Sequence, residues 1–397
     1  MSSELPEGWQ DVSLSDCLED FRNGWTYDTR ALDGTMPITR IETISNGEID
    51  YDRIGFAQPD GRIEAFRLRP NDILFSHINS VEHIAKVAIK HDDRPLYHGM
   101  NLMRLRPNGQ VVPHFLFARL QSEKARDHFR SVCKRAVNQA SLNKGEIGSY
   151  RLSLPPVEEQ RRIAEVLRSV DEAIAAQQRA ALQMQSLLQA TCCDLLPDPN
   201  AVLDYDGWSQ VTIGEFAKIR TGKTPSTKNG DYWDGDIPFV TPTDLGNDLS
   251  VPTTARTLTG EGARQSTVTP PNSVLYTCIA SIGKIGLAEK AVAFNQQINA
   301  CACRDFNDAA FLYWSLYRMT PIIRDLCGTT AVPIINKGAF SRLNLWVPEA
   351  SARGEIGMTL NQLASVVQNA HQTVAQTRTL KNRIMSDLLS GRVRVPE

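Results

Sequence analysis

One internal repeat constrains the fold of this chain more than any other feature of its sequence. At a constant offset of 193 residues, Asn143-Lys144-Gly145 lands on Asn336-Lys337-Gly338, Pro155 lands on Pro348, and Asp194-Leu195-Leu196 lands on Asp387-Leu388-Leu389. With 397 residues, the chain is long enough for two domains. The repeat therefore predicts two similar halves, each of which ends in the same kind of segment.

Each copy of the repeat predicts one long amphipathic helix. Apolar residues recur at alternating spacings of four and three, which is the seam of a coiled coil. The first positions of the two seams are Ile163, Leu167, Val170 and Ile174, and Ile356, Leu360, Leu363 and Val367. At 1.5 Å per residue, a helix of about forty residues is roughly 55–60 Å long. Such a helix needs a partner, and the other copy in the same chain can supply it.

The sequence also marks the ends of these helices and a few polar interruptions. The start signals are Pro155, Pro156, Glu158 and Glu159, and the stop signals are Pro197 and Gly391. Proline suits a first helical turn, carboxylates favour the positive end of the helix dipole, and glycine often follows a helix. The polar seam positions are Gln177, Thr377 and Lys381. We expect them to set the register of the helices or to face other subunits.

The rest of each half predicts a mixed globule of short strands and helices. Both halves open on a Gly-Trp pair, at Gly8-Trp9 and Gly207-Trp208, and the Pro- and Asp-containing segment 197–200 links them. Asn-Lys-Gly reads as a turn that uses glycine backbone freedom, at Gly145 and Gly338. The fold class is α+β, with a pseudo-two-fold internal repeat. The predicted boundaries are 1–154 and 198–347 for the globules, and 155–197 and 348–397 for the helices.

Composition places few limits on function. The net charge of −2 does not favour nucleic acid as a partner, but residues 101–150 hold nine Lys or Arg against three Asp or Glu. No apolar run reaches the length of a membrane span, and the polar start lacks a secretory signal, so we expect a cytoplasmic protein. The eight cysteines lack the spacing of zinc knuckles, and we expect all of them to be reduced, without a metal.

Familiar catalytic motifs are missing from the sequence. Arg220-Thr221-Gly222-Lys223-Thr224 resembles half of a phosphate-binding loop, but Ala217 stands where the first glycine is required. No Gly-x-Gly-x-x-Gly loop occurs, and the histidines lack the spacing of a zinc pair. The pattern favours a binding protein over an enzyme.

Several segments together resemble one known family. Leu142-Asn143-Lys144-Gly145, then Leu154-Pro155-Pro156-Val157-Glu158-Glu159-Gln160, and the two Gly-Trp pairs are similar to the DNA specificity subunit of type I restriction-modification systems. The resemblance covers essentially the whole chain. The second copy departs from the Pro-Pro-x-x-Glu-Gln wording at Pro348-Glu349-Ala350-Ser351-Ala352-Arg353. The start of the second helix is therefore expected to differ in detail.

The resemblance implies a non-catalytic subunit. Each globule would be a target recognition domain that reads one half of a split double-stranded DNA site, and the helices would pack antiparallel as a spacer. Adenine methyltransferase subunits, expected as two copies, and motor-nuclease restriction subunits would dock on this chain. The cofactors S-adenosylmethionine, ATP and Mg would belong to those partners, with none in this chain. No membrane partner is implied.

Base readout uses Arg or Lys, Asn or Gln, and Thr or aromatic groups, whereas phosphate contacts need only positive charge and small donors. The expected DNA-binding residues of the first half are Arg22, Asn23, Trp25, Tyr27, Arg40, His77, Asn79, His83, Lys86, Lys134, Arg135, Asn138 and Gln139. Those of the second half are Arg220, Lys223, Thr224, Thr241, Thr243, Ser281, Lys284, Gln296, Gln297, Thr329, Thr330 and Lys337. Lys144 is left open as a further phosphate contact.

Two other classes of function remain open. One is a structural scaffold with two ligand-binding globules on a coiled-coil spacer and no role with DNA. The other is a self-contained nuclease or methyltransferase, which would show turnover by the isolated chain.

Overall fold

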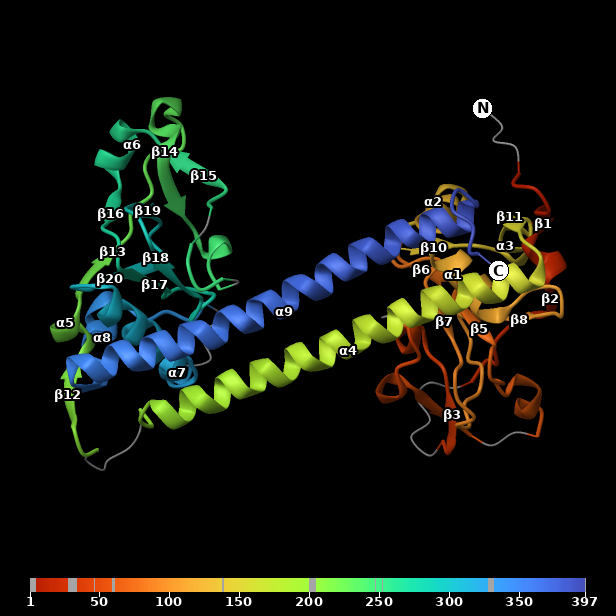
Figure 1. Ribbon diagram of the computed structural model, residues 1–397, viewed down its shortest axis with the longest axis horizontal. Coiled ribbons are helices and arrows are strands. Elements are labelled where there is room, and N and C mark those ends of the chain that lie inside the picture. The colour runs from red at the N-terminus through yellow and green to blue at the C-terminus, as the bar shows by residue number, and fades with distance from the viewer. Residues whose placement is uncertain are drawn as a thin grey trace. The chain divides into compact units, whose positions relative to one another are not determined.

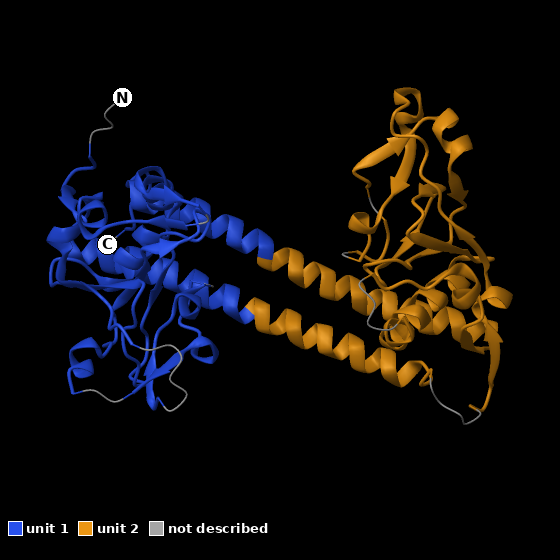
Figure 2. Ribbon diagram, turned by 180° about the vertical axis from the view of Figure 1, so that it is seen from behind, with its two compact units in different colours: residues 1–176, 375–397 blue, residues 177–374 orange. Residues whose placement is uncertain are grey.

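Two compact units divide the chain, and the division cuts each long helix into two parts. The computed structural model describes residues 5–27, 34–45, 47–58, 61–137, 139–199, 205–246, 248–251, 253–327 and 332–396. Unit 1 comprises residues 1–176 and 375–397, and unit 2 comprises residues 177–374 (Figure 2). This division differs from the boundaries expected at residues 154, 197 and 347, because each globule packs with one end of each helix.

The two long helices have nearly the bounds that the sequence predicts. Helix α4 spans Val157–Leu195 and helix α9 spans Ala350–Ser390 (Figure 1). Helix α4 begins directly after the two prolines and ends before Pro197. Helix α9 ends at Gly391, which has the positive φ of +72° that favours glycine after a helix. No described helix is long and apolar enough to cross a membrane.

The helices run antiparallel within each unit. In unit 1, Ile163 near the start of α4 shares a hydrophobic cluster with Leu388 near the end of α9. In unit 2, Leu188 near the end of α4 shares a cluster with Leu360 near the start of α9. The structure buries the seam residues Ile163, Leu167, Ile174, Ile356, Leu360 and Val367, and half-buries Val170 and Leu363. The apolar seam thus becomes part of the core of each unit.

Unit 1 is built on a four-stranded antiparallel sheet in the order β2-β8-β5-β7. Its strands are β2 Leu18–Asn23, β5 Ile73–Ser76, β7 Val87–Ile89 and β8 Leu102–Pro107. Smaller sheets pair β1 Gln10–Ser13 with β11 Arg151–Leu154, β3 Met36–Ile38 with β4 Gly55–Ala57, and β10 Gln139–Ser141 with both β6 Ile78–Asn79 and β9 Lys134–Ala136. The helices are α1 Pro113–Gln121, α2 Glu123–Val132 and α3 Lys144–Gly148.

Unit 2 repeats this frame and enlarges it. Its central sheet has the order β13-β20-β17-β18, from Lys218–Thr221, Ile298–Ala302, Ser273–Thr277 and Ile285–Ala288. A second sheet has the order β15-β14-β19-β16, from Arg256–Leu258, Trp233–Val240, Val292–Phe294 and Thr267–Thr269. Strand β12 Trp208–Thr212 pairs with β21 Asn344–Pro348. The shorter helices are α5 Ile213–Phe216, α6 Gly260–Gln265, α7 Phe306–Leu326 and α8 Lys337–Ser341.

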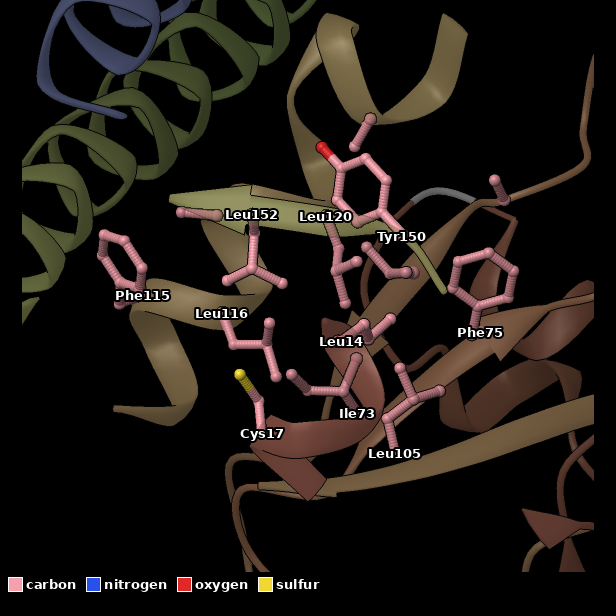
Figure 3. Close-up of a cluster of buried hydrophobic side chains, with 14 of the residues drawn as sticks. Leu14, Cys17, Ile73, Phe75, Leu105, Phe115, Leu116, Leu120, Tyr150 and Leu152 are labelled. Atoms are coloured by element: carbon pink, nitrogen blue, oxygen red, sulfur yellow. The ribbon is translucent and has the colours of Figure 1, made fainter. Parts of the chain in front are cut away.

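The core of unit 1 forms where the sheet meets α1 and the ends of the chain. Leu14, Ile73 and Leu105 converge with Leu116 and Leu152 (Figure 3), and all of them are at most 1% exposed. Full burial of such a side chain contributes about 1.5–3 kcal/mol. This cluster packs one face of the central sheet against α1 and β11.

Short signals that occur twice in the sequence have the same structure in both units. Gly8 and Gly207 both adopt positive φ, +79° and +77°, as each Gly-Trp pair turns into its first strand. The Asn-Lys-Gly motif, however, is not the glycine turn that was predicted. Asn143 and Asn336 cap the short helices α3 and α8, each accepting the third backbone N–H at 2.9 Å. That prediction was wrong because an asparagine side chain can supply the cap itself.

Candidate nucleic-acid interface

In unit 1, one end of the central sheet gathers segments that are distant in sequence. Asn23 at the end of β2 faces Met103, Ser76 at the end of β5 faces Leu102, and Phe75 faces Val87 at the start of β7. The segments 23–27, 77–86 and 98–101 therefore leave the sheet at this same end. We call it the loop end of unit 1.

A small sheet adds four predicted residues beside the loop end. Strand β6 directly follows β5, and the Leu142 backbone N–H donates to the His77 carbonyl at 2.9 Å. In this sheet Ala140 of β10 faces both Asn79 of β6 and Arg135 of β9. The small sheet thus brings together Asn79, Lys134, Arg135 and Gln139, of which the last three are exposed.

Unit 2 has an equivalent loop end. Thr221 at the end of β13 faces Asn299, Thr277 at the end of β17 faces Ile298, and Tyr276 faces Ile285 at the start of β18. The segments 222–224, 278–284 and 295–297 meet there. They carry the predicted residues Lys223, Thr224, Ser281, Lys284, Gln296 and Gln297. A hydrogen bond of 2.6 Å from the Thr224 hydroxyl to Gln296 Oε1 ties two of these segments together.

A glycine allows two chain segments to cross closely at each loop end. A Cβ atom added to Gly24 would lie 1.9 Å from the carbonyl oxygen of Gly99, and one added to Gly222 would lie 2.0 Å from that of Asn295. The next backbone N–H in each loop then donates to the crossing strand, from Trp25 to His98 at 2.7 Å and from Lys223 to Phe294 at 3.0 Å. Any other residue would push these loops apart.

Two predicted lysines hold the loops in place from equivalent positions. The Lys86 ammonium donates to the Ser45 carbonyl at 2.6 Å, and the Lys284 ammonium donates to the Pro242 carbonyl at 2.9 Å. Both side chains are half-buried. Each lysine therefore anchors a loop that follows a strand of another sheet, at Ser45 after β3 or at Pro242 after β14, and its amine already has a protein acceptor.

Several other predicted residues at or near the loop ends bond within the protein. Arg22 contacts Asp20 at 2.6 Å, Arg40 contacts Glu42 at 3.2 Å, and Arg220 donates to the Val268 carbonyl at 3.0 Å. All three guanidinium groups remain on exposed residues. The Thr241 and Thr243 hydroxyls lie 2.8 Å apart. These exposed side chains can therefore contact a ligand while the contacts within the protein hold them in place.

The aromatic and histidine predictions have mixed positions. Trp25 and Tyr27 are half-buried against a small apolar cluster, and the Arg62 guanidinium, which the sequence reading missed, lies 5.3 Å from the Trp25 ring centre. His83 is exposed, whereas His77 is 6% exposed. Burial lowers the pKa of His77 to about 4. His77 therefore lies inside unit 1 as a neutral imidazole, and its side chain is not part of the exposed surface of the loop end.

The remaining predictions lie at the edges of these surfaces or beyond the described residues. Lys337 is exposed at the start of α8, and Lys144 at the start of α3 lies 5.2 Å from the Phe21 ring centre. Asn138, Thr329 and Thr330 fall outside the described residues. The loop ends thus collect most of the predicted set, and the exposed polar side chains there differ between the two units.

Comparison with known families matches both halves of the chain. The model of the type I restriction modification DNA specificity domain matches residues 6–184 and again residues 205–376. A putative type I restriction enzyme specificity subunit, MjaX, of Methanocaldococcus jannaschii is 29% identical over 99% of this chain and 95% of its own length. The specificity subunit of the HindI enzyme of Haemophilus influenzae is 22% identical over 86% of this chain and 90% of its own length.

The fold is similar to that of a solved structure whose description also concerns the type I restriction-modification system. A chain from work on complex assembly and conformational transition of the type I system superposes with a TM-score of 0.63 at 20% identity, over 98% of this chain and all of the other. At this identity the likeness concerns the fold alone.

Proposed function

The chain belongs to the type I restriction-modification DNA specificity family, with two copies of its domain, and we propose that each unit reads one half of a split duplex DNA site. Members of this family are non-catalytic components of restriction-modification systems, and we assign that role to this chain. A single chain with two different readers can recognise an asymmetric site, which a symmetric dimer cannot do.

The observation that carries this proposal is the pair of equivalent loop ends. Both units hold the loops with the same devices, namely a close glycine crossing and an anchoring lysine, while the exposed side chains differ. Unit 1 presents Lys134, Arg135 and Gln139, and unit 2 presents Lys223 and Gln296. Cationic groups suit phosphates and guanine, and amides suit adenine. A rigid frame with different polar groups favours two readers of different sequences.

The partners belong to the same proposal. We assign the binding of S-adenosylmethionine, ATP and Mg to adenine methyltransferase subunits, in two copies, and to motor-nuclease subunits. Helices α4 and α9 are the proposed docking elements, because Leu182, Leu187 and Met358 are at least half exposed on them. Exposed leucine and methionine side chains are frequent in protein–protein contacts. A cytoplasmic location stays a prediction.

The test is DNA binding by this chain assembled with its methyltransferase partner. Lys134→Ala and Lys223→Ala should weaken binding to all duplexes and reduce the slope of log K against log salt by about 1 each. The matched controls are Arg69→Ala and Lys290→Ala, since these exposed cations flank the opposite ends of the two sheets. They should change neither quantity.

The alternative functions predict different results. A scaffold without a DNA role predicts that all four variants bind DNA as the wild type does, with no preference for a split site. An enzyme predicts that the isolated chain modifies or cuts DNA when it is supplied with S-adenosylmethionine or Mg²⁺. Either result would overturn the proposal.

A further inference from the structure

Unit 2 exposes an apolar face where an antiparallel pair of strands would normally be polar. Ile334 forms an isolated antiparallel bridge with Ile279, the Ile335 N–H donates to the Cys278 carbonyl at 3.0 Å, and the Ala280 N–H donates to Pro333 at 2.9 Å. Ile335 and Cys278 point into the core, being 7% and 3% exposed. Antiparallel pairs with one buried face usually turn polar side chains to water on the other.

The outward side of this pair carries Val332 and Ile334. The two residues of an antiparallel bridge point to the same side and successive side chains of a strand alternate, so Ile334 and the bridged Ile279 share the face opposite Ile335. Val332 lies two residues before Ile334, at a bend of the chain. Ile334 is 55% exposed and Val332 is 57% exposed. Single exposed apolar residues are ordinary on protein surfaces, but here two lie two positions apart beside the loop end.

Unit 1 provides an internal reference for this position. At the offset of 193 residues, Val332 corresponds to Gln139 and Ile334 corresponds to Ser141. In unit 1, Ser141 pairs with Ile78 on one side and Lys134 on the other, and Leu142 donates to His77 just as Ile335 donates to Cys278. The same backbone arrangement therefore carries an amide, a hydroxyl and an ammonium in one unit and two branched aliphatic side chains in the other.

We propose that Val332 and Ile334 contact the C5-methyl groups of thymine in the half-site that unit 2 reads. This inference rests on the proposed DNA-reading function and specifies the bases involved. In the major groove only thymine presents a methyl group, and apolar side chains discriminate thymine by contact with it. The outward face of unit 1, with Gln139, Ser141 and Lys134, suits donor and acceptor groups of bases instead. The two half-sites thus differ in how they are read.

The proposal predicts a specific response to removal of the methyl group. The wild-type chain, assembled with its methyltransferase partner, first selects its preferred duplex from a random pool. Thymines in each half-site are then replaced one at a time by deoxyuridine, which differs from thymine only in lacking the methyl group. Replacement in one half-site should weaken binding about fourfold for each contacted methyl, from about 0.8 kcal/mol per buried carbon. In the other half-site it should have no effect.

Variants connect this response to the proposed residues. Ile334→Ser introduces the side chain found at the matching position of unit 1, and it should abolish the deoxyuridine effect at the thymine that Ile334 contacts. The double variant Val332→Gln with Ile334→Ser, which carries both side chains of unit 1, should bind thymine and deoxyuridine duplexes equally. Ser141→Ala in unit 1 and Val393→Ser, which changes an apolar residue that is 52% exposed in the C-terminal tail, should keep the fourfold difference. Because all of these positions are half-buried or exposed, the variants should keep the fold.

The outcomes separate this proposal from the proposed function. Selection of no preferred duplex would overturn the DNA-reading function. A preferred duplex whose binding is unaffected by deoxyuridine in either half, or equally affected in the wild type and in Ile334→Ser, would overturn the thymine contact alone. Loss of methyltransferase binding in Ile334→Ser with an unchanged deoxyuridine response would also overturn it, by assigning the apolar face to a protein partner.

Discussion

At the scale of single residues, two different side chains bind the proline carbonyl that precedes each long helix. Gln160 donates to the Pro155 carbonyl at 2.8 Å and accepts the Val112 backbone N–H at 2.8 Å. Arg353 stands at the matching position in the second copy. It donates to the Pro348 carbonyl at 2.8 Å and to the Asp308 carboxylate at 2.7 Å. The second copy thus has Arg353 where the family motif has glutamine, and the Asp308 carboxylate on α7 is the partner of this arginine.

The first prediction concerns this arginine. In Arg353→Gln the Asp308 carboxylate, which is 7% exposed, keeps only Arg304 at 3.1 Å as a cationic partner. We expect unit 2 to lose about 1–3 kcal/mol of stability, the usual loss when a buried charged acceptor gives up a donor. Urea unfolding followed by tryptophan fluorescence measures the loss. In the double variant with Asp308→Asn the loss should be smaller than the sum of the two single losses, and additive losses would contradict the coupling.

Two buried histidines lead to the second prediction. Burial lowers the pKa of His77 to about 4 and that of His98 to about 3, below the ordinary value of 6.5. The unfolded chain therefore takes up protons as the pH falls below 6.5, while the folded chain does not. The stability that is present above pH 6.5 should decrease between pH 6.5 and 4, by up to about 1.4 kcal/mol per pH unit for each histidine.

Unfolding midpoints of unit 1 between pH 7 and 5 measure this effect, before most carboxylates titrate. His77→Gln should flatten the pH dependence, because the glutamine that replaces the imidazole does not titrate. An unchanged slope in His77→Gln would show that the imidazole is protonated in the folded chain. The sequence could not identify His77 as buried, because a histidine after a short strand is equally compatible with a core and with a surface.

At the scale of elements, polar residues in the helical seam have distinct roles. Lys381 of α9 pairs with Asp171 of α4 at 2.5 Å and is 17% exposed. This ion pair fixes the register of the helices within unit 1. Gln177 is half-buried, and its Oε1 has no hydrogen-bond partner among the described residues. A polar residue in such a seam reduces stability while it restricts the register.

The third prediction follows from this unpaired oxygen. Gln177→Leu should raise the unfolding free energy by about 1 kcal/mol, because a leucine fills the seam without burying an unpaired acceptor. The control is Gln183→Leu at an exposed position of the same helix, which should change it by less than about 0.5 kcal/mol. The thermal unfolding midpoints of the wild type, Gln177→Leu and Gln183→Leu measure these changes. A lower midpoint for Gln177→Leu would mean that the amide has a partner in solution.

Elements differ in how far the sequence determines them. The long helices were predictable because their seam repeats over many turns and a stop signal, Pro197 or Gly391, follows each of them. The capped helices α3 and α8 were read as turns, because five residues are too few to show a period. The strands of the second sheet of unit 2 were not predicted individually, since β15, β16 and β19 are three residues each and obtain their stability from long-range packing.

At the loop ends too, the sequence alone could not predict which role each residue has. Gly24 and Gly222 lie next to residues that were expected to bind DNA, but the reason for glycine is a backbone crossing with residues about 75 positions away. The anchoring roles of Lys86 and Lys284 likewise depend on carbonyl groups that are about 40 residues distant. The sequence selects candidate residues by type alone, and only the tertiary structure separates those that hold loops from those that face outward.

At the scale of the whole molecule, unit 1 depends on the last residues of the chain. Met385, Leu388 and Leu389 of α9 are at most 5% exposed in the core of unit 1. The buried Arg119 guanidinium also donates to the Leu389 carbonyl at 2.6 Å. The Arg394 guanidinium contacts the Glu159 carboxylate, which in turn accepts from Trp9 at 3.2 Å. The first and last segments of the sequence therefore belong to one folding unit.

The fourth prediction is that a chain ending at residue 374 loses unit 1 and keeps unit 2. The deletion removes three buried apolar side chains, each worth about 2–5 kcal/mol when truncated, which together exceed the stability of an ordinary domain. Limited proteolysis should then digest residues 1–176 and leave a fragment within 177–374 intact. Full-length Leu388→Ala should weaken unit 1 without unfolding it. Protection of unit 1 in the shortened chain would contradict the shared core.

This shared core also sets an order of completion during synthesis. A growing chain emerges from the ribosome amino end first, and domains generally fold as units while it does so. All of unit 2, residues 177–374, is available before any of residues 375–397. Unit 1 begins to emerge first but waits for the final segment before its core can close. The half that is translated first is therefore finished last, and until then the apolar side chains that Met385, Leu388 and Leu389 cover lack that cover.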